Sequence, residues 1–430
     1  MYKLDSLLNQ IKSKKGFTWI LLGQLLSVFI LIISGKIIAI YIAPEVFGHY
    51  NLLLGAFTLA SNLLFMPLIQ SYRFSLQNHD QQRVTSFYIT LIYICNCLIS
   101  VSAGLAFAAG YISATAAVIF AAYAFVQSIQ NIVLVYLNLK AQHKSYAISL
   151  IILNLTNLVL LFLLAICLRM ASMEVLLFVL LISNALSVSF GFLKAKNQYG
   201  FHLKISREWK REKELIRELM QYVKPLIGLA LLNWLNTQAD RFILSAQLSV
   251  TEVGYYAAGY GLGSKIFLTL VGPMQLYLQP IIFNIKSQNA HPSVGQQATT
   301  KAFIGYAAIG LTLCAIIFFM RNFIGRTLLS SSYQPSFQII PIIALGYLIT
   351  TLSDLIYITF YAFGHSRIIL TITFFVSITI ISLNLILVPT HGITGAAIAC
   401  VSGFTLQLIL SLYFYRSVIS KPLSYASTST

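Results

Sequence analysis

An acidic and a basic residue stand side by side in a strongly apolar part of the chain. The stretch 234–248 reads WLNTQADRFILSAQL and contains Asp240 and Arg241. Neighbouring helical positions point about 100° apart, so we expect these two side chains not to neutralise each other directly. Each of them then needs another partner or water. One face of the predicted helix carries a polar set: Asn233, Asn236, Thr237 and Asp240.

Similar polar positions recur in other apolar stretches, and together they form the candidate site. We predict substrate-binding roles for a set of basic and amide residues: Arg241, Lys265, Lys36, Asn233, Asn236, Asn62 and Gln275. Asp240 and Asp354 are the candidate ion-coupling carboxylates, because a buried acid can take up a proton. We predict neither a catalytic residue nor a metal ligand.

Charges inside apolar segments require a physical reason, because each one costs about 2.5–3.5 kcal/mol at mid-membrane. One interpretation is a water-filled cavity between two halves of the protein. Its embedded charges would sum to +2 over one acid and three cations: Asp240, Lys36, Arg241 and Lys265. A cationic cavity suits an anionic group such as a phosphate. The alternative is a structural pair between helices, formed by Asp240 with Lys265 or by Asp354 with Lys36.

The elements that must position these residues are membrane helices. Charged residues make up only 9% of the 430 residues and hydrophobic residues 58%, whereas a soluble domain is about 25% charged. The net charge of +17 comes from basic residues in short loops, as membrane orientation requires, and does not indicate nucleic acid. The polar N-terminal segment, followed by a long apolar run, predicts that there is no cleavable signal.

Apolar runs between polar breaks predict an all-α integral membrane fold with twelve transmembrane helices. Their ranges are 17–40, 50–70, 87–109, 115–138, 148–168, 175–195, 223–247, 255–282, 300–320, 337–361, 368–388 and 393–415. Of the 28 Lys and Arg residues, 22 fall in segments on the cytoplasmic side if the N-terminus is cytoplasmic, and three fall in outside loops. This distribution predicts that both termini are cytoplasmic.

The two halves of the chain share marked positions at a constant spacing. Three pairs of residues are 206 positions apart: Gly48 and Gly254, Tyr50 and Tyr256, and Pro67 and Pro273. We therefore expect two parallel six-helix lobes related by an axis along the membrane normal, as in alternating-access transporters. The predicted lobes are residues 1–200 and 223–430, and residues 201–222 join them.

The joining segment carries charges around an apolar stripe. It begins FHLKISREWKREKELIRELM at residue 201, and its stripe consists of Trp209, Leu215, Ile216, Leu219 and Val223. We predict a helix over 201–222 that lies on the cytoplasmic face, with its basic groups against anionic lipid. The alternative is a solvated linker.

Cysteine and histidine spacing gives no sign of a metal or redox centre. The five cysteines lie in apolar runs without metal-binding spacing. No HExxH, GxSxG, Walker or dinucleotide-binding pattern occurs in the chain. The sequence therefore predicts no cofactor, and it leaves coupling to H+ or Na+ open.

Several segments have an order and spacing typical of one protein family. They are AIYIAPEVFGHY (39–50), ADRFIL (239–244) followed by VGYYAAGYGL (253–262), and NLILVPTHGITGAAIA (384–399). Their order and spacing, over nearly the whole chain, are similar to those of the polysaccharide flippases, the Wzx-type O-antigen transporters of the multidrug/oligosaccharidyl-lipid/polysaccharide exporter superfamily. The chain departs from that pattern at Ile40 and Ala43, where the family often has arginine and glycine.

This resemblance implies a protein of the cell inner membrane that moves undecaprenyl-pyrophosphate-linked oligosaccharide repeat units from the cytoplasmic to the periplasmic leaflet. It implies alternating access coupled to an ion gradient, and it carries over to Asp240, Arg241, Gly48 and Gly254. The partners that it implies are membrane lipids, a polysaccharide polymerase and a chain-length regulator, without nucleic acid.

Two other function classes stay open at this point. A cation- or proton-coupled multidrug exporter of the same superfamily would favour acids and aromatic residues in its cavity. A membrane polymerase or ligase acting on the same lipid-linked sugar would carry a large periplasmic loop with basic residues. The predicted outside loops are short, the longest being 321–336, so we expect a transporter and not an enzyme.

Overall fold

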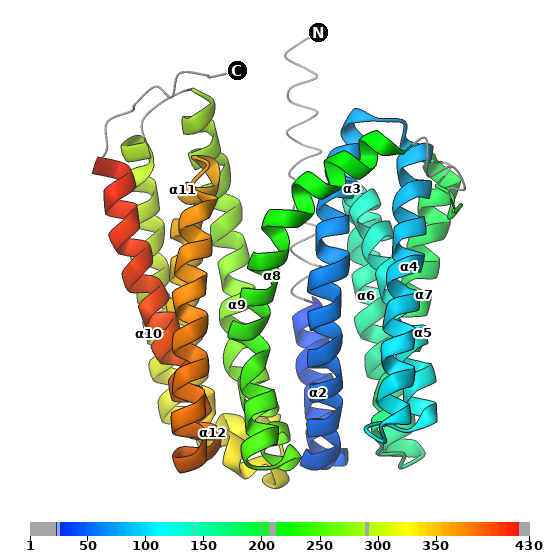
Figure 1. Cartoon of the computed structure of the whole chain (residues 1–430). Helices are drawn as coiled ribbons and strands as arrows, with labels where there is room; N and C mark the ends of the chain where they lie inside the picture. Colours follow the sequence, from blue (N-terminus) through cyan, green and yellow to red (C-terminus); the bar gives the residue numbers. More distant parts are fainter. Residues whose placement is uncertain are drawn as a thin grey trace. The chain divides into compact units, whose positions relative to one another are not determined.

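The structure of the chain, a computed structural model, describes residues 23, 26–140, 142–199, 201–205, 212–288 and 292–420. All regular elements within these residues are helical, which confirms the predicted all-α fold class (Figure 1). The chain divides into two compact units, Met1–Leu231 and Leu232–Thr430. We call them unit 1 and unit 2 and describe each by itself.

Unit 1 consists of helices whose starts have local causes. Its elements are the helix Leu26–Tyr41, α2 (Pro44–Ala60), η1 (Ser61–Phe65), α3 (Met66–Asn78), α4 (Gln81–Ala108), α5 (Ala114–Leu139), α6 (His143–Leu161), η2 (Phe162–Cys167), α7 (Met173–Tyr199) and the beginning of α8 (Lys213–Gln247). Pro44 suits the first turn of α2 because that turn needs no N–H donor. Asp80 and Ser113 cap α4 and α5 by accepting hydrogen bonds from backbone N–H groups.

The second helical span of each repeat is irregular near its proline. In unit 1 the π turn η1 separates α2 from α3, and Pro67 follows it. A proline ring clashes with the carbonyl group four residues earlier, and the wider π turn relieves that clash. In unit 2, α9 (Val250–Ser287) contains Pro273 and bends by 40° between residues 275 and 277. Gly48 and Gly254 both lie buried in the second turn of their helices, α2 and α9.

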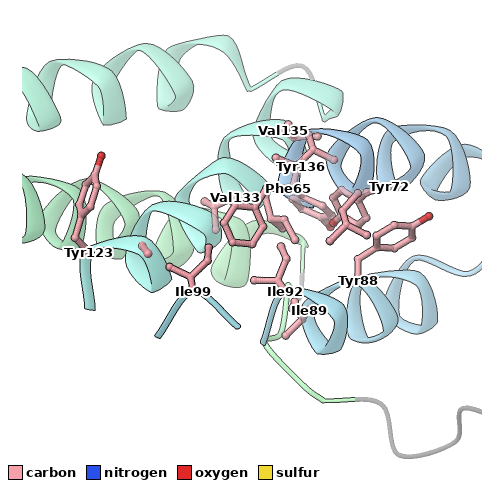
Figure 2. Packing of buried hydrophobic residues seen from close by; sticks show 14 of the residues in the cluster. Phe65, Tyr72, Tyr88, Ile89, Ile92, Ile99, Tyr123, Val133, Val135 and Tyr136 are labelled. Atoms are coloured by element: carbon pink, nitrogen blue, oxygen red, sulfur yellow. The ribbon is translucent and has the colours of Figure 1, made fainter. Parts of the chain in front are cut away.

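The core of unit 1 is rich in large aromatic side chains. Phe65, Tyr72 and Tyr88 are at most 1% exposed, and Figure 2 shows them with Tyr136 and neighbouring aliphatic residues. The ring centroids of Tyr72 and Tyr88 lie 5.4 Å apart. Burial of one such apolar side chain contributes about 1.5–3 kcal/mol, so this cluster holds α3, α4 and α5 together.

Unit 2 is arranged around α11 (Ile339–Ala362), which is buried along most of its length. The other elements of the unit are the end of α8, α9, η4 (Pro292–Gly295), α10 (Gln296–Leu328), η5 (Ser331–Gln338) and α12 (Ser366–Ser420). Helices α9, α10 and α12 all pack against α11. Gly263 of α9 permits the close approach to α11, because a Cβ atom there would lie 2.7 Å from the Ile340 carbonyl oxygen.

The long element α12 is a pair of antiparallel helices joined at Gly392. Gly392 has φ 59° and ψ −139°, a conformation that glycine adopts far more readily than other residues. Gly395 packs on the backbone of Leu387, and Gly403 packs on Ile380. Residues on opposite sides of the turn therefore lie next to each other, and the two arms coincide with the predicted runs 368–388 and 393–415.

Replacing Gly395 with alanine is expected to destabilise the protein by about 1–3 kcal/mol. The new Cβ would overlap the carbonyl group of Leu387, which is backbone and cannot rotate away. Gly305→Ala is the matched control, because Gly305 is an exposed residue in α10 with open space around it, and alanine there is expected to stabilise the helix by about 0.5–1 kcal/mol. Thermal unfolding of the purified variants measures both effects, and equal midpoints would contradict the packing at this turn.

Eight helices of the described residues are long and apolar enough to cross a membrane, or nine if the bent α9 counts as one span. The protein is therefore a multi-pass membrane protein. The count of twelve crossings stays a prediction, because α8 is not among these helices, Leu26–Tyr41 is shorter than the others, and α12 is counted once. The predicted cytoplasmic termini lie outside the described residues.

Helix α8 differs from the segment predicted over 201–222. Residues 213–222 are the first turns of a helix that runs without a break to Gln247, so the predicted end of the joining segment falls inside α8. Leu215 and Leu219 are 0% and 8% exposed and belong to the core of unit 1. Protein therefore covers Leu215 and Leu219, whereas Ile216 of the same stripe is exposed. Trp209 lies outside the described residues, and the predicted lobe boundaries stay predictions.

Candidate functional site

Asp240 and Arg241 form an ion pair inside unit 2. The Arg241 Nη1 atom lies 3.4 Å from the Asp240 Oδ1 atom, and the two residues are 7% and 2% exposed. The expectation that they do not neutralise each other directly is therefore wrong. The helix sets only the direction of each Cβ atom, whereas the long Arg241 side chain turns back along α8. Its Nη1 also donates to the Thr237 carbonyl oxygen at 2.6 Å.

Tyrosines from two other helices surround this pair. On α9, the Tyr256 hydroxyl donates to Asp240 Oδ2 at 2.6 Å. The Arg241 guanidinium lies 4.7 Å from the ring centroid of Tyr260, a distance typical of cation–π contacts. The hydroxyls of Tyr260 and of Tyr347 on α11 share a hydrogen bond of 2.6 Å. We refer to Asp240, Arg241, Tyr256, Tyr260 and Tyr347 as the charged network.

The charged network satisfies its own charges. Both carboxylate oxygens of Asp240 accept hydrogen bonds, one of them also from the Arg241 backbone N–H at 2.8 Å. A buried ion pair of this kind is weak evidence for net stability, but removing one partner is strongly destabilising. The charged network therefore joins α8, α9 and α11 through side-chain contacts. The substrate-binding role of Arg241 and the ion-coupling role of Asp240 stay predictions.

The polar face predicted on α8 becomes more buried toward Asp240. Asn233 is exposed, whereas Asn236 is 8% exposed. The Thr237 hydroxyl donates to the Asn233 carbonyl oxygen at 2.9 Å. Within the described part of the chain, the side-chain oxygen of Asn236 has no hydrogen-bond partner. Asn233 and Asn236 are thus the members of this face with capacity left for a ligand or water.

Helix α9 carries two more of the predicted residues. Lys265 is half-buried, and it forms no ion pair with any carboxylate of unit 2 that the structure describes. The alternative pair of Asp240 with Lys265 is therefore not formed. Gln275 is half-buried and stands directly before the bend of α9. Lys265 thus places a positive charge in an apolar helix without a described counterion in its own unit.

Asp354 lies on α11 and is half-buried. It forms no ion pair with a described basic residue of unit 2. Three residues earlier, Thr351 Oγ1 accepts a hydrogen bond of 3.0 Å from the Tyr306 hydroxyl of α10. A carboxylate near hydroxyl groups and without a described cation in its own unit is compatible with the predicted ion-coupling role, which stays a prediction.

The remaining predicted residues, Lys36 and Asn62, belong to unit 1. Lys36 is half-buried in the helix Leu26–Tyr41, whose Ile37 packs with residues of η2 and α7. Asn62 is half-buried within the π turn η1, and such turns are frequent at functional sites. Since the predicted residues are divided over the two units, the cavity between the halves stays a prediction.

Metal binding finds no support in the described residues. They contain no group of three or more His, Cys, Asp or Glu side chains that could hold a metal ion. All five cysteines are free thiols.

Sequence reasoning missed the part that Tyr260 plays in the charged network. The repeat marks Tyr256 only through its spacing from Tyr50, and that spacing gives it no role. The signal was present in VGYYAAGY, where Tyr256 and Tyr260 are four residues apart and so share one face of α9. Two tyrosines on one helical face in an apolar segment indicate a polar partner on a neighbouring helix.

Sequence reasoning also missed two buried polar contacts between helices of unit 1. Asn96 of α4 donates to Ser128 Oγ of α5 at 2.8 Å, and Gln130 of α5 donates to Ser187 Oγ of α7 at 3.0 Å. Amide and hydroxyl groups often join helices in this way inside membranes. These contacts are internal to unit 1 and explain why its apolar helices contain amides.

Comparison with known families places the chain among proteins of polysaccharide biosynthesis. A family model described as polysaccharide biosynthesis protein matches residues 13–286. Among curated proteins, no sequence matches the chain. The family match covers all the predicted site residues except Asp354.

Solved structures show the same fold at low sequence identity. An inward-facing multidrug resistance MATE family transporter of the MOP superfamily has a TM-score of 0.73 and 14% identity, over 92% of this chain and 94% of that one. The lipid II flippase MurJ in an inward closed conformation has a TM-score of 0.69 and 14% identity, over 93% and 87% of the two chains. A MOP superfamily transporter from Pyrococcus furiosus, described as having reversed polarity of its binding pocket, has a TM-score of 0.66 and 15% identity, over 95% and 96%.

Proposed function

The chain belongs to the polysaccharide biosynthesis protein family, and on that premise we propose that it is a flippase for lipid-linked oligosaccharides. The family match over residues 13–286 is the observation that carries this proposal. The fold of MOP superfamily transporters supports it, since one structure with that fold is a lipid II flippase. Family and fold indicate a transporter, and a transporter of this kind is not an enzyme.

The proposed substrate is an undecaprenyl-pyrophosphate-linked oligosaccharide repeat unit, moved from the cytoplasmic to the periplasmic leaflet of the cell inner membrane. The excess of Lys and Arg in the predicted cytoplasmic loops supports the orientation with both termini in the cytoplasm. The repeat of Gly48 and Gly254 at matching positions of α2 and α9 supports alternating access by two similar halves.

The geometry favours a division of roles among the candidate residues. Lys265 has no described counterion in unit 2, so we assign it to the phosphate groups. Asn233 and Gln275 are accessible amides that suit sugar hydroxyls. Arg241 is held by the charged network, so we assign it to positioning α8 against α9. For ion coupling, Asp354 is a better candidate than Asp240, whose oxygens are already occupied.

Cells that lack this protein are expected to accumulate single lipid-linked repeat units, and the wild-type chain is expected to clear them. The physical reason is that a charged pyrophosphate and several sugars cannot cross the hydrocarbon core unaided. The measurement is the amount of lipid-linked saccharide extracted from cells with the empty vector or the wild-type chain. Accessibility to a membrane-impermeant sugar oxidant then tells which leaflet the units face.

The multidrug exporter is the second candidate, because a solved multidrug resistance transporter shares the fold over most of both chains. It predicts a different outcome of the same experiment. Normal levels of lipid-linked saccharide in the deleted strain, together with raised sensitivity to cationic drugs, would contradict the flippase and support the exporter. Accumulated units of more than one repeat would instead indicate a step after translocation.

A further inference from the structure

Two carboxylates, Glu212 directly before α8 and Glu218 in its second turn, connect the start of α8 to α3 and α4 of the same unit. Both oxygens of Glu218 are in use, one accepting from Ser75 Oγ at 2.8 Å and the other lying 2.8 Å from His79 Nε2. Glu212 lies 3.0 Å from Arg83 Nε and is 4% exposed. Helix α8 therefore meets the end of α3 and the first turn of α4 through a histidine and an arginine.

The same histidine and arginine line a pocket of about 700 Å³ in unit 1. The segment after α7 adds two more basic side chains, His202 and Lys204, and both are exposed. The aromatic side chains of Tyr136 and Phe201 also line the pocket, and their ring centroids lie 4.7 Å apart. Four side chains able to carry positive charge thus face one pocket from three parts of the chain.

The acids near the pocket are already engaged. Asp80 is the acid among the pocket-lining residues that the structure describes, and its side chain accepts the backbone N–H of Arg83 at 2.9 Å. Glu212 and Glu218 pair with Arg83 and His79 and do not line the pocket themselves. An anion in the pocket would therefore have to share Arg83 and His79 with these two carboxylates, whereas the two basic side chains after α7 take no part in these ion pairs.

We propose that this pocket binds a phosphate-bearing group, and that the bound phosphate competes with Glu212 and Glu218 for Arg83 and His79. Phosphate offers several acceptor oxygens, which match the fork of an arginine, the ammonium group of Lys204 and the ring N–H donors of the histidines. Occupation of the pocket then weakens the contacts of the first turns of α8 with α3 and α4. Binding of phosphate in this pocket does not depend on the proposed function, whereas the identification of a lipid as the molecule that carries the phosphate rests on it.

The test measures binding of radiolabelled inorganic pyrophosphate to the purified full-length chain in detergent, by equilibrium dialysis. Lys204→Glu is expected to weaken binding at least about tenfold, because a charge-assisted contact becomes a repulsion. Lys196→Glu is the matched control, since Lys196 is an exposed lysine in the last turn of α7 and does not line the pocket. Equal losses in both variants, or no saturable binding by the wild-type chain, would overturn the site.

A second set of variants tests whether phosphate competes with Glu212 and Glu218. Glu212→Gln and Glu218→Gln each remove a competitor while keeping the shape of the side chain, so both are expected to tighten pyrophosphate binding severalfold. A purely structural role of the two carboxylates would leave binding unchanged or weaken it. Unchanged or weaker binding in both variants would therefore overturn the exchange between phosphate and α8.

The source of the phosphate follows from competition against the labelled pyrophosphate. Dioctanoyl phosphatidic acid, inorganic phosphate and phosphate-free dioctanoylglycerol are compared. Displacement by phosphatidic acid at much lower concentration than by inorganic phosphate assigns the site to a lipid-borne phosphate, and equal displacement assigns it to free phosphate. Displacement by dioctanoylglycerol would overturn recognition of the phosphate.

The dialysis experiment does not depend on transport, so it tests the pocket separately from the proposed function. Clearance of lipid-linked units by a chain that does not bind pyrophosphate would contradict the pocket alone. Pyrophosphate binding without accumulation of units in the deleted strain would contradict the flippase alone.

Discussion

Replacing Asp240 with alanine is expected to lower the free energy of unfolding by about 3–5 kcal/mol, the cost of leaving one partner of a buried ion pair alone. The change would strand the Arg241 guanidinium, which is 7% exposed, and would remove the acceptor of the Tyr256 hydroxyl. The measurement is denaturant or thermal unfolding of the purified protein. Asp354→Ala is the matched control, because Asp354 is also an acid in unit 2 but has no described ion-pair partner there, and its effect is expected to stay within about 1 kcal/mol.

A double-mutant cycle shows whether the network and not the single carboxylate is responsible. Tyr256→Phe removes one hydrogen bond to a charged group and is expected to cost about 1.5–3 kcal/mol. Combined with Asp240→Ala, its effect should be non-additive by about 0.5–3 kcal/mol, because both changes remove the same contact. Additive effects, or a loss for Asp354→Ala as large as that for Asp240→Ala, would contradict the charged network.

The helices were predictable because apolar length is a strong signal in a membrane protein. Every predicted run that falls within the described residues coincides with a helix, and even the reversal at Gly392 between the last two runs is found. The ends were less predictable, since α4 starts at Gln81 and α10 runs to Leu328, beyond the apolar core of each run. Helices continue into polar surroundings when a cap or an ion pair stabilises them, and a hydropathy pattern does not contain that information.

The partners of the charged side chains were not predictable from spacing. A helical face gives the direction in which a side chain starts, but Arg241 reaches both Thr237, one turn earlier, and the neighbouring Asp240. The apolar periodicity predicts that Leu215 and Leu219 are shielded from water. Periodicity alone does not distinguish shielding by lipid from shielding by protein. The pairing of Glu218 with His79 joins residues 139 positions apart, which only the tertiary structure could show.

Replacing Lys265 with glutamine is expected to slow clearance of accumulated lipid-linked repeat units at least about tenfold. A hydrogen bond to a charged group is worth about 1.5–3 kcal/mol, and 1.4 kcal/mol corresponds to a factor of ten. The measurement is the rate at which induced variant protein clears the units that a deleted strain has stored. Lys301→Gln is the matched control, because Lys301 is an exposed lysine of the same unit, near the start of α10, and it is expected to clear them at the wild-type rate.

Lys265 is the sharper probe of the substrate path because its loss does not break a contact that holds the fold. Arg241→Ala would abolish clearance through instability of the charged network even if Arg241 never met the substrate. Lys265, in contrast, is half-buried and forms no ion pair with a described carboxylate of unit 2. Neutralising it therefore removes a desolvated charge and is not expected to destabilise the protein. Slow clearance with an unchanged unfolding midpoint would therefore mean that the charge serves the substrate. Wild-type clearance by Lys265→Gln would leave the flippase intact and remove Lys265 from its phosphate site.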